Sequence, residues 1–368
     1  MRHSRATVSP VVEAWTAYRT ASAGEWTADQ LMAAKGDTRV SVVIPAHDEE
    51  NTVGPIVTTI RRYLVERVPL VDELIVVDSH STDRTAAKAA AAGAEVVGQD
   101  EISRNLPRLD GKGGALWAGL AGSTGDVIAF VDADLREFRP HFVTGLLGPL
   151  LLDPSVAFVK GFYHRPLIGT ESRPDSPGRD SVDPDSPGRD AHRGGRDGDR
   201  ADIDPDGGGR VTELAARPLL NLFWPELAGF VQPLAGEYAG RRTALERIPF
   251  VSDYGVEIAM LIDLLELVGL DALAQVDLGE RLHRHQSTDA LGRMSAQIML
   301  TAWSRLQRQG RVTATGTPAG VLTQFRRGAA TAVPSLDREI VVSDVSVQER
   351  PPLIELRDRL SGLGRVSV

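Results

Sequence analysis

Two aspartates at the end of an apolar run are the residues of this chain best placed to do chemistry. Asp132 and Asp134 flank Ala133 directly after Val127–Val131. Such a run is typical of a strand buried on both faces of a parallel sheet, and ligands bind just beyond the carboxyl ends of these strands. A divalent cation held there by carboxylate oxygen would neutralise a departing diphosphate, as a nucleotide-sugar transferase requires. A polar turn in which an aspartate caps a loop or helix fits this stretch equally well.

Two glycine-containing stretches are candidate phosphate sites. Residues 110–114 place Lys112 among glycines at a predicted helix start, and residues 207–212 bring Arg210 and Thr212 to a second one. Free backbone amides and the helix dipole favour anions at such a start, and the nearby cation adds to this. The first stretch could also be a surface turn, and the glycines of the second could simply end an insertion. Two phosphate sites would suit two anionic substrates.

Carboxylates in apolar sequence and a histidine pair are further candidates. Glu237 and Glu257 each need a partner if they are buried, and each could hold a sugar hydroxyl or act as a structural hydrogen-bond hub. His283 and His285 share one face of an extended segment, so either could complete a metal site with Asp134. A histidine beside arginines is also a common surface residue.

The loop after the first predicted strand argues against a dinucleotide-dependent oxidoreductase. Residues 45–50 read Pro-Ala-His-Asp-Glu-Glu, where such enzymes carry Gly-x-Gly-x-x-Gly. A carboxylate beside backbone amides suits a nucleobase or a ribose edge. Capping of the next helix by Asp48 or Asn51 would explain the same residues.

Strands that alternate with helices must position these side chains. Apolar runs predict strands over 40–44, 73–78, 94–97, 126–134, 156–163 and 274–278, with helices between most of them. The helix that begins near Asp253 is apolar almost all round, which is typical of a buried helix. βαβ units of this kind predict an α/β fold with a mostly parallel sheet.

Residues 165–208 interrupt this pattern. They repeat Asp-Ser-Pro-Gly-Arg-Asp at 175–180 and 185–190 and are poor in apolar residues, so we predict a disordered insertion. The predicted organisation is an N-terminal arm (1–38), a first α/β half (39–164), the insertion (165–208), a second half (209–309) and a C-terminal arm (310–368) that docks on the body or on a partner subunit.

Composition narrows the class of protein. The net charge of −9 argues against a general nucleic-acid-binding surface. The 368 residues include no cysteine, which excludes disulfides, thiolate metal sites and cysteine nucleophiles. No apolar run reaches membrane-spanning length and the N-terminus lacks a signal-peptide core, so a cytoplasmic protein without a membrane partner is expected.

In combination, the motifs resemble the glucosyl-3-phosphoglycerate synthase family. The shared pieces follow the family's order over about residues 39–300: Val-Val-Ile-Pro-Ala, Val-Asp-Glu-Leu-Ile-Val, Ser-Thr-Asp, Gly-Lys-Gly, Asp-Ala-Asp, Gly-Gly-Arg-Val-Thr-Glu-Leu, Arg-Pro-Leu-Leu, Gln-Pro-Leu-Ala-Gly-Glu-Tyr, Tyr-Gly-Val-Glu-Ile and Arg-x-His. The resemblance implies a GT-A fold, with nucleotide-sugar binding in 39–164 and acceptor binding and metal completion in 209–309. It implies retaining transfer of glucose from a nucleotide donor, typically UDP-glucose, to the 2-hydroxyl of 3-phosphoglycerate. A divalent metal, Mg²⁺ or Mn²⁺, and a homodimer are also implied.

Carried over position by position, the resemblance gives each candidate a role. Asp134 and His283 would bind the metal, and Asp132 would hold the ribose. The rest of the donor site would be Pro45, Ala46, Glu49, Ser79, Lys112 and Ala133. The acceptor site would be Gly209, Arg210, Val211, Thr212 and His285. The catalytic residues would be Glu257, which orients the glucose, Arg281, which lies beside the diphosphate or acceptor, and Leu234.

The chain also departs from the family pattern, and other activities remain open. Ala133 stands where serine is common, His47-Asp48 replaces Leu-Asn, and His285 replaces an asparagine near the acceptor. Since no carboxylate is an obvious nucleophile, we expect front-face attack, with the backbone of residues 234–236 near the reacting hydroxyl. The alternatives are a mannosyl-3-phosphoglycerate synthase, a catalytically silent nucleotide-sugar binder, and a sugar nucleotidyltransferase, which would need a glycine-rich loop after the first strand.

Overall fold

The computed structural model describes residues 9–104, 106–164, 167–168, 203–204, 209–281, 287–313, 315–327 and 338–360. Within the predicted insertion it describes only a short antiparallel pair, β7 (Leu167–Ile168) with β8 (Ile203–Asp204). We predicted disorder for the rest of the insertion, and these residues lie outside the described ones. The same holds for His283 and His285, whose roles were also predicted.

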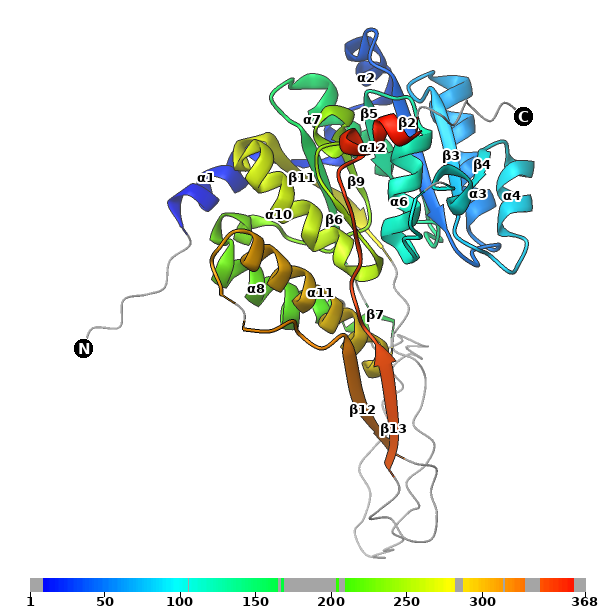
Figure 1. Cartoon of the computed structure of the whole chain (residues 1–368). Coiled ribbons are helices and arrows are strands. Elements are labelled where there is room, and N and C mark those ends of the chain that lie inside the picture. The colour runs from blue at the N-terminus through cyan, green and yellow to red at the C-terminus, as the bar shows by residue number, and fades with distance from the viewer. Residues whose placement is uncertain are drawn as a thin grey trace, which may run out of the picture.

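An eight-stranded sheet forms the centre of the molecule (Figure 1). Its strand order is β1 (Thr20–Ser22), β11 (Leu273–Glu280), β6 (Phe158–His164), β9 (Tyr238–Arg241), β5 (Val127–Phe130), β2 (Val40–Ala46), β3 (Glu73–Asp78) and β4 (Glu95–Gly98). Only β9 runs antiparallel to its neighbours in this sheet. The prediction of an α/β fold with a mostly parallel sheet is therefore confirmed.

Helices cover both faces of the sheet, because successive strand residues point to opposite sides. Val43 belongs to one core cluster and its neighbours Val42 and Ile44 to the other. The first cluster includes α6 (Gly111–Gly122), α8 (Arg217–Phe223), α10 (Val256–Val268) and α11 (Thr288–Arg308). The second includes α2 (Ala28–Lys35), α3 (Val53–Ile60) and α7 (His141–Leu152), and α4 (Thr85–Ala92) packs beside α3. The strands predicted from apolar runs are thus buried on both sides.

The N-terminal residues contribute to the sheet itself. Helix α1 (Pro10–Arg19) leads into β1, the edge strand, which the sequence did not predict. Trp15 is buried, and its indole Nε1 donates a hydrogen bond to the Leu273 carbonyl at 2.9 Å. Residues 10–22 are consequently tied to β11, which leads to the candidate site.

The C-terminal residues form a protruding ribbon and then return to the body (Figure 1). Strands β12 (Val321–Arg327) and β13 (Arg338–Asp344) pair with each other, where the sequence had predicted only a weakly patterned arm. Strand β14 (Glu349–Arg350) then pairs with β10 (Phe250–Val251), and α12 (Leu353–Leu360) follows. The short helices α5 (Gln99–Ile102) and α9 (Arg242–Leu245) complete the described α-helices. No described helix is long and apolar enough to cross a membrane.

Candidate active site

Charged side chains from several segments meet at the carboxyl ends of the central strands. Two cations and four carboxylates form what we call the charged cluster: Lys112 of α6, Asp132 and Asp134 after β5, Glu237 before β9, Glu257 of α10 and Arg281 after β11. Negative charge exceeds positive charge among these six side chains. The cluster lies where open α/β sheets bind their ligands, and it is suited to a further cation.

Lys112 bridges two of the carboxylates. Its Nζ lies 2.7 Å from Asp132 Oδ1 and 2.9 Å from Glu257 Oε1. Burial alone would lower the pKa of Lys112, but Asp132 and Glu257 outweigh it and hold the pKa well above its usual value. The ammonium is therefore charged at neutral pH and ties α6 and α10 to the end of β5.

Arg281 holds the other side of the charged cluster. It is 8% exposed, and its guanidinium contacts Asp134 at 2.6 Å, Glu237 at 2.9 Å and Asp132 at 3.5 Å. It also donates a hydrogen bond to the Tyr163 hydroxyl at 2.6 Å. A planar guanidinium can serve several acceptors at once, which an ammonium does less well. Arg281 thus fixes three carboxylates from two segments, the residues after β5 and the residue before β9.

The two aspartates that flank Ala133 differ in their surroundings. Burial would raise the pKa of Asp132, but Lys112 and Arg281 outweigh it and lower that pKa, so the carboxylate stays ionised. Partial burial and the nearby Asp132 raise the pKa of Asp134, although Arg281 opposes them. The Asp134 side chain is 53% exposed and that of Asp132 only 19%. Asp134 is therefore the carboxylate of this pair that an incoming ligand can reach.

Glycines let the backbone approach the charged cluster closely. A Cβ on Gly236 would lie 2.1 Å from Asp132 Oδ2, and a Cβ on Gly113 would lie 1.7 Å from the Val251 carbonyl oxygen. Residues 234–236 can therefore lie beside Asp132, and α6 can pack against the loop that follows β10. Packing accounts for Gly113 in the Gly-Lys-Gly motif, while Lys112 supplies the charge.

The predicted nucleotide side lies at the ends of β2 and β3. The Ser79 amide donates to the Ala46 carbonyl at 2.8 Å, and the Ser79 hydroxyl donates to Gln99 Oε1 at 2.7 Å. Gln99 is buried and donates in turn to the Leu109 carbonyl at 2.6 Å, just before the Lys112 loop. Glu49 follows β2 and accepts a hydrogen bond from the Thr52 hydroxyl at 2.9 Å. No sequence motif pointed to Gln99, because its role depends on neighbours that the fold supplies.

The second predicted phosphate loop begins a helical run. Gly209 has a φ of +83°, and helical backbone starts at Arg210 and continues into α8. Val211 and Thr212 are buried, whereas Arg210 is exposed. The backbone geometry therefore matches the predicted helix start, and the most exposed of these side chains is the cation.

Lys160, Tyr163 and Tyr238 are residues near the charged cluster that sequence reasoning missed. Tyr163 contacts Arg281, and Lys160 lies over the Tyr238 ring. A lysine inside an otherwise apolar strand such as β6 was the available signal, since an unpaired buried charge is costly.

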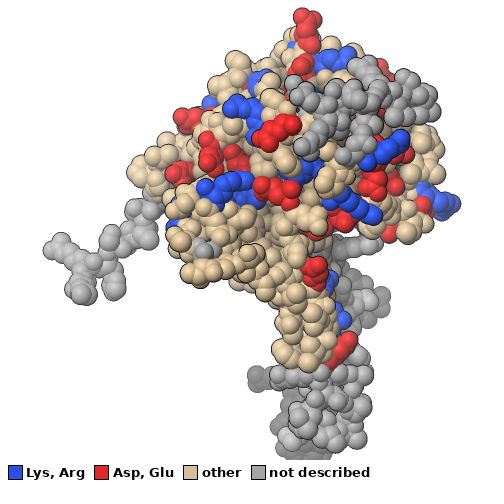
Figure 2. Space-filling model, viewed as in Figure 1, with Lys and Arg blue, Asp and Glu red and all other residues tan. Residues whose placement is uncertain are grey.

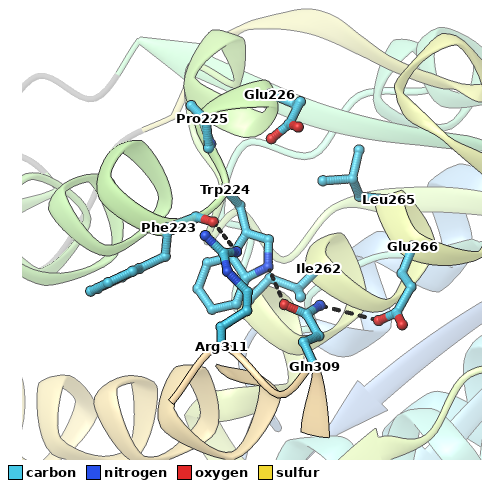
Figure 3. Close-up of a pocket in the computed structure, with 9 residues that line it drawn as sticks. All are labelled: Phe223, Trp224, Pro225, Glu226, Ile262, Leu265, Glu266, Gln309 and Arg311. Carbon is cyan, nitrogen blue, oxygen red and sulfur yellow. Dashed lines mark hydrogen bonds between the residues drawn. The ribbon is translucent and has the colours of Figure 1, made fainter. Parts of the chain in front are cut away.

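A separate cavity of about 470 Å³ shares no residue with the charged cluster (Figure 3). The Trp224 indole donates to Gln309 Oε1 at 3.1 Å, and Gln309 Nε2 donates to Glu266 at 3.1 Å. These hydrogen bonds connect the end of α8 with α10 and α11 (Figure 3). None of the predicted site residues lines this cavity.

Comparison with known proteins points to one family. Residues 41–196 match the family model "Glycosyl transferase family 2". The chain is 44% identical to the glucosyl-3-phosphoglycerate synthase of Mycolicibacterium smegmatis over 91% of this chain and 95% of that protein. It is 36% identical to the glucosyl-3-phosphoglycerate synthase of Petrotoga mobilis, over 88% of each chain.

Two solved structures extend the comparison. The glucosyl-3-phosphoglycerate synthase of Mycobacterium tuberculosis, in complex with Mn²⁺, UDP and glucosyl-3-phosphoglycerate, has a TM-score of 0.70 and 40% identity, covering 90% of this chain and 97% of that one. The mannosyl-3-phosphoglycerate synthase of Rubrobacter xylanophilus has a TM-score of 0.78 and 36% identity, covering 95% of this chain and 99% of that one. The GT-A fold and glycosyltransferase class predicted from the motifs are confirmed, and the chain belongs to the glucosyl-3-phosphoglycerate synthase family.

Proposed function

We propose that this protein transfers glucose from UDP-glucose to the 2-hydroxyl of 3-phosphoglycerate, with retention of configuration, and that it requires Mg²⁺ or Mn²⁺. The observation that carries the proposal is the charged cluster, in which Lys112 bridges Asp132 and Glu257 while Asp134, paired with Arg281, stays half exposed. This arrangement lies at the end of β5, in a chain 44% identical to a glucosyl-3-phosphoglycerate synthase over most of its length.

The residues present fit a divalent metal. Asp134 offers a half-exposed carboxylate of the hard oxygen type that such ions prefer, and His283 is the second proposed ligand. When bound, the metal would neutralise the charge that develops on the departing diphosphate. The described residues contain no cluster of three potential ligands, so water and the donor phosphates would complete the coordination.

The chain's own groups would bind and orient the donor. A nucleoside would bind at the ends of β2 and β3, where the structure places Pro45, Ala46, Glu49 and Ser79. Asp132 is ionised, so its carboxylate is suited to accept a hydrogen bond from a ribose hydroxyl. Lys112 and Arg281 are cations beside the place where phosphate would lie. Glu257, fixed by Lys112, would accept a hydrogen bond from a glucose hydroxyl.

The acceptor would bind at Gly209–Thr212. The amides at this helix start and the exposed Arg210 guanidinium suit the phosphate of 3-phosphoglycerate. For retention, the acceptor hydroxyl would attack from the face of the leaving group, beside the backbone of residues 234–236. Gly236 supports this placement because it allows that backbone to lie against Asp132.

A panel of nucleotide sugars tests the proposal. UDP-glucose, other nucleoside diphosphate glucoses and GDP-mannose are each incubated with 3-phosphoglycerate, with and without Mn²⁺. Nuclear magnetic resonance of the product identifies the sugar and its anomeric configuration. We expect α-linked glucosyl-3-phosphoglycerate that forms only with metal. Turnover of GDP-mannose alone would instead indicate a mannosyl-3-phosphoglycerate synthase, the activity named for the similar Rubrobacter xylanophilus protein.

We also propose that the protein is a homodimer in the cytoplasm, where both substrates are metabolites. The ribbon supports the dimer, because Val321, Phe325, Ile340 and Val342 are each at least 58% exposed. The register pairs Phe325 with Ile340 and places all four side chains on one face of the ribbon. The side of the ribbon that faces the viewer in Figure 2 carries few charges. An exposed apolar face of this kind is typical of an interface. Light scattering should show a dimer for the native chain and a monomer for Phe325→Glu.

A further inference from the structure

Lys160 is a buried amine beside the charged cluster. Its side chain is 1% exposed, and Nζ has no hydrogen-bond acceptor among the described residues. Nζ lies 4.4 Å from the centroid of the Tyr238 ring, whose hydroxyl is also buried without a described hydrogen-bond partner. Leaving a buried cation unpaired is costly, so a methionine here would give a more stable chain. The retention of an amine at this place requires another explanation.

Lysine is rare in this chain, which makes the buried amine of Lys160 more unusual. Of the 41 lysine and arginine residues in the chain, only four are lysines: Lys35, Lys88, Lys112 and Lys160. Lys35 is buried but pairs with Asp72 at 2.7 Å, and Lys88 lies near the surface, 3.7 Å from Glu50. Two of the four therefore lie at the charged cluster. A guanidinium keeps its proton in proteins, whereas a buried amine can release and regain one.

The groups that face Lys160 explain why its proton is weakly held. Phe158, two residues earlier in β6, belongs to the core on the α6 and α10 face, whereas Val159 belongs to the core that α7 covers. The register partner of Lys160 in β11 is the uncharged Gln275. On the α6 and α10 face, burial lowers the pKa of Lys160 to about 7 and Lys112 adds to this, against the attraction of Glu257, Glu237 and Asp132. Tyr238, whose ring lies against Nζ, is also titratable, and burial raises its own pKa well above the usual value.

Whether Lys160 is protonated depends on Lys112, because Lys112 is paired with both Asp132 and Glu257, the carboxylates that attract the Lys160 ammonium. A substrate phosphate that attracts Lys112 would weaken its contact with both carboxylates. The diphosphate and 3-phosphoglycerate together carry more negative charge than one divalent metal ion neutralises, so their binding with the metal would also add net negative charge near Nζ. Both changes favour the ammonium form of Lys160.

We propose that Lys160 is a positioning residue that takes up one proton from solvent when the anionic substrates bind, and that its ammonium then holds Glu257 and Asp132 while Lys112 contacts substrate. The inference deepens the proposed function and rests on it. Lys160 itself does not touch substrate. It acts through the carboxylates that orient the sugar and the ribose.

The small number of lysines makes a direct test practical. The full-length protein is labelled with ¹³C at lysine Cε, whose chemical shift reports protonation, and titrated from pH 5 to about pH 11, where a free lysine has lost its proton. The titration is repeated with UDP, Mn²⁺ and 3-phosphoglycerate. In the ligand-free protein we expect one signal, absent from Lys160→Met, to titrate near pH 7. With ligands present, the midpoint of that signal should move upward by at least about one pH unit, a tenfold change in proton affinity.

Matched variants separate this role from a structural one. Lys160→Met should melt at a higher temperature than the native chain. The difference should grow as the pH falls from about 10.4 to about 7, because there the unfolded chain binds a proton that the folded chain does not. Lys35→Met removes a buried lysine that is already paired, so it should lower the melting temperature and leave the Lys160 titration unchanged.

Two outcomes would overturn the inference. In the first, no signal titrates below about pH 9 in the ligand-free protein, which would mean that Lys160 is already charged. In the second, the ligands shift the Lys112 signal, which shows binding, but leave the Lys160 midpoint unchanged. If the ligands shift neither signal, the protein does not bind them, and the proposed function fails together with this inference.

Discussion

Two clusters of ion pairs in this molecule each combine cations with aspartate and glutamate, but they differ in the balance of charge. Between α10, α11 and β14, Arg305 contacts Asp263 at 2.7 Å and Glu349 at 2.6 Å, and Arg308 contacts the same two carboxylates. Two cations there face two acids. In the charged cluster, Lys112 and Arg281 face four carboxylates.

The difference in balance distinguishes a structural cluster from a binding site. A balanced set of ion pairs neutralises its own charge, so no side chain is left as an uncompensated buried charge that needs a further ligand. A set with excess carboxylate leaves negative charge that a metal or another cation can neutralise. The balanced cluster fastens the C-terminal residues to the body, whereas the unbalanced one gathers segments from both halves of the chain around an open carboxylate.

Replacing Asp134 should have the largest effect on activity. Loss of even a group that only supports a metal ligand costs about 10–100-fold, so Asp134→Ala should reduce turnover by at least that factor. The melting temperature should hardly change, because the side chain is half exposed and Arg281 keeps its contacts with Asp132 and Glu237. Steady-state rates at limiting Mn²⁺ and thermal melting check both statements. Native turnover of Asp134→Ala at limiting metal would show that this carboxylate does not bind the ion.

Replacing Arg305 should have the largest effect on stability. Arg305 is 1% exposed, and Arg305→Met would leave Asp263 and Glu349 with Arg308 alone. Removal of one partner from a buried pair costs about 3–5 kcal/mol, which denaturant unfolding can measure. Arg308→Met is the matched control and should cost less, since that side chain is 42% exposed. Comparable losses in the two variants would contradict the importance given to burial.

Replacing Arg210 should affect one substrate only. Hydrogen bonds to charged groups contribute roughly 1.5–3 kcal/mol each, so Arg210→Ala should raise the KM for 3-phosphoglycerate by at least about tenfold. Arg210→Lys should restore it only in part, because an ammonium lacks the planar pair of donors. Calorimetry should show nearly native UDP-glucose affinity in both variants. A collapse of donor affinity would instead assign this loop to the donor diphosphate.

The smallest effect is expected at an exposed ion pair. The hydrogen bond from Ser155 and then the contact with Arg19 lower the pKa of Asp153 to about 2. A lowered carboxylate pKa stabilises the fold above the unfolded value of about 3.9, and this contribution is lost as the pH falls toward 2. Asp153→Asn should therefore show a slightly smaller fall in melting temperature between pH 4 and pH 2. An identical pH dependence in the two proteins would show that the pair contributes nothing.

Local sequence predicted the strands and helices that have strong patterns. Strand β3 begins and ends at the predicted residues, and the run before Asp132 is β5 of the central sheet. Strand β1 was missed because three residues with little apolar character carry no local signal, and the neighbouring β11 lies about 250 residues away. The β12–β13 ribbon was missed because the intervening residues give no recognisable turn motif.

The site shows the same division. Motifs identified five residues that the structure brings into contact: Lys112, Asp132, Asp134, Glu257 and Arg281. Gln99 and Lys160 could not be identified, because their importance arises from neighbours that only the fold supplies. The roles of His283 and His285 stay predictions.

Binding of Mn²⁺ tests the central claim most directly. Free Mn²⁺ can be followed by electron paramagnetic resonance while the ion is titrated into the protein in the presence of UDP. The native chain should bind Mn²⁺ stoichiometrically, Asp134→Asn should lose this binding, and folded Asp263→Asn should keep it. Native Mn²⁺ binding by Asp134→Asn, or its loss in folded Asp263→Asn, would contradict the assignment of the charged cluster as the metal and donor site.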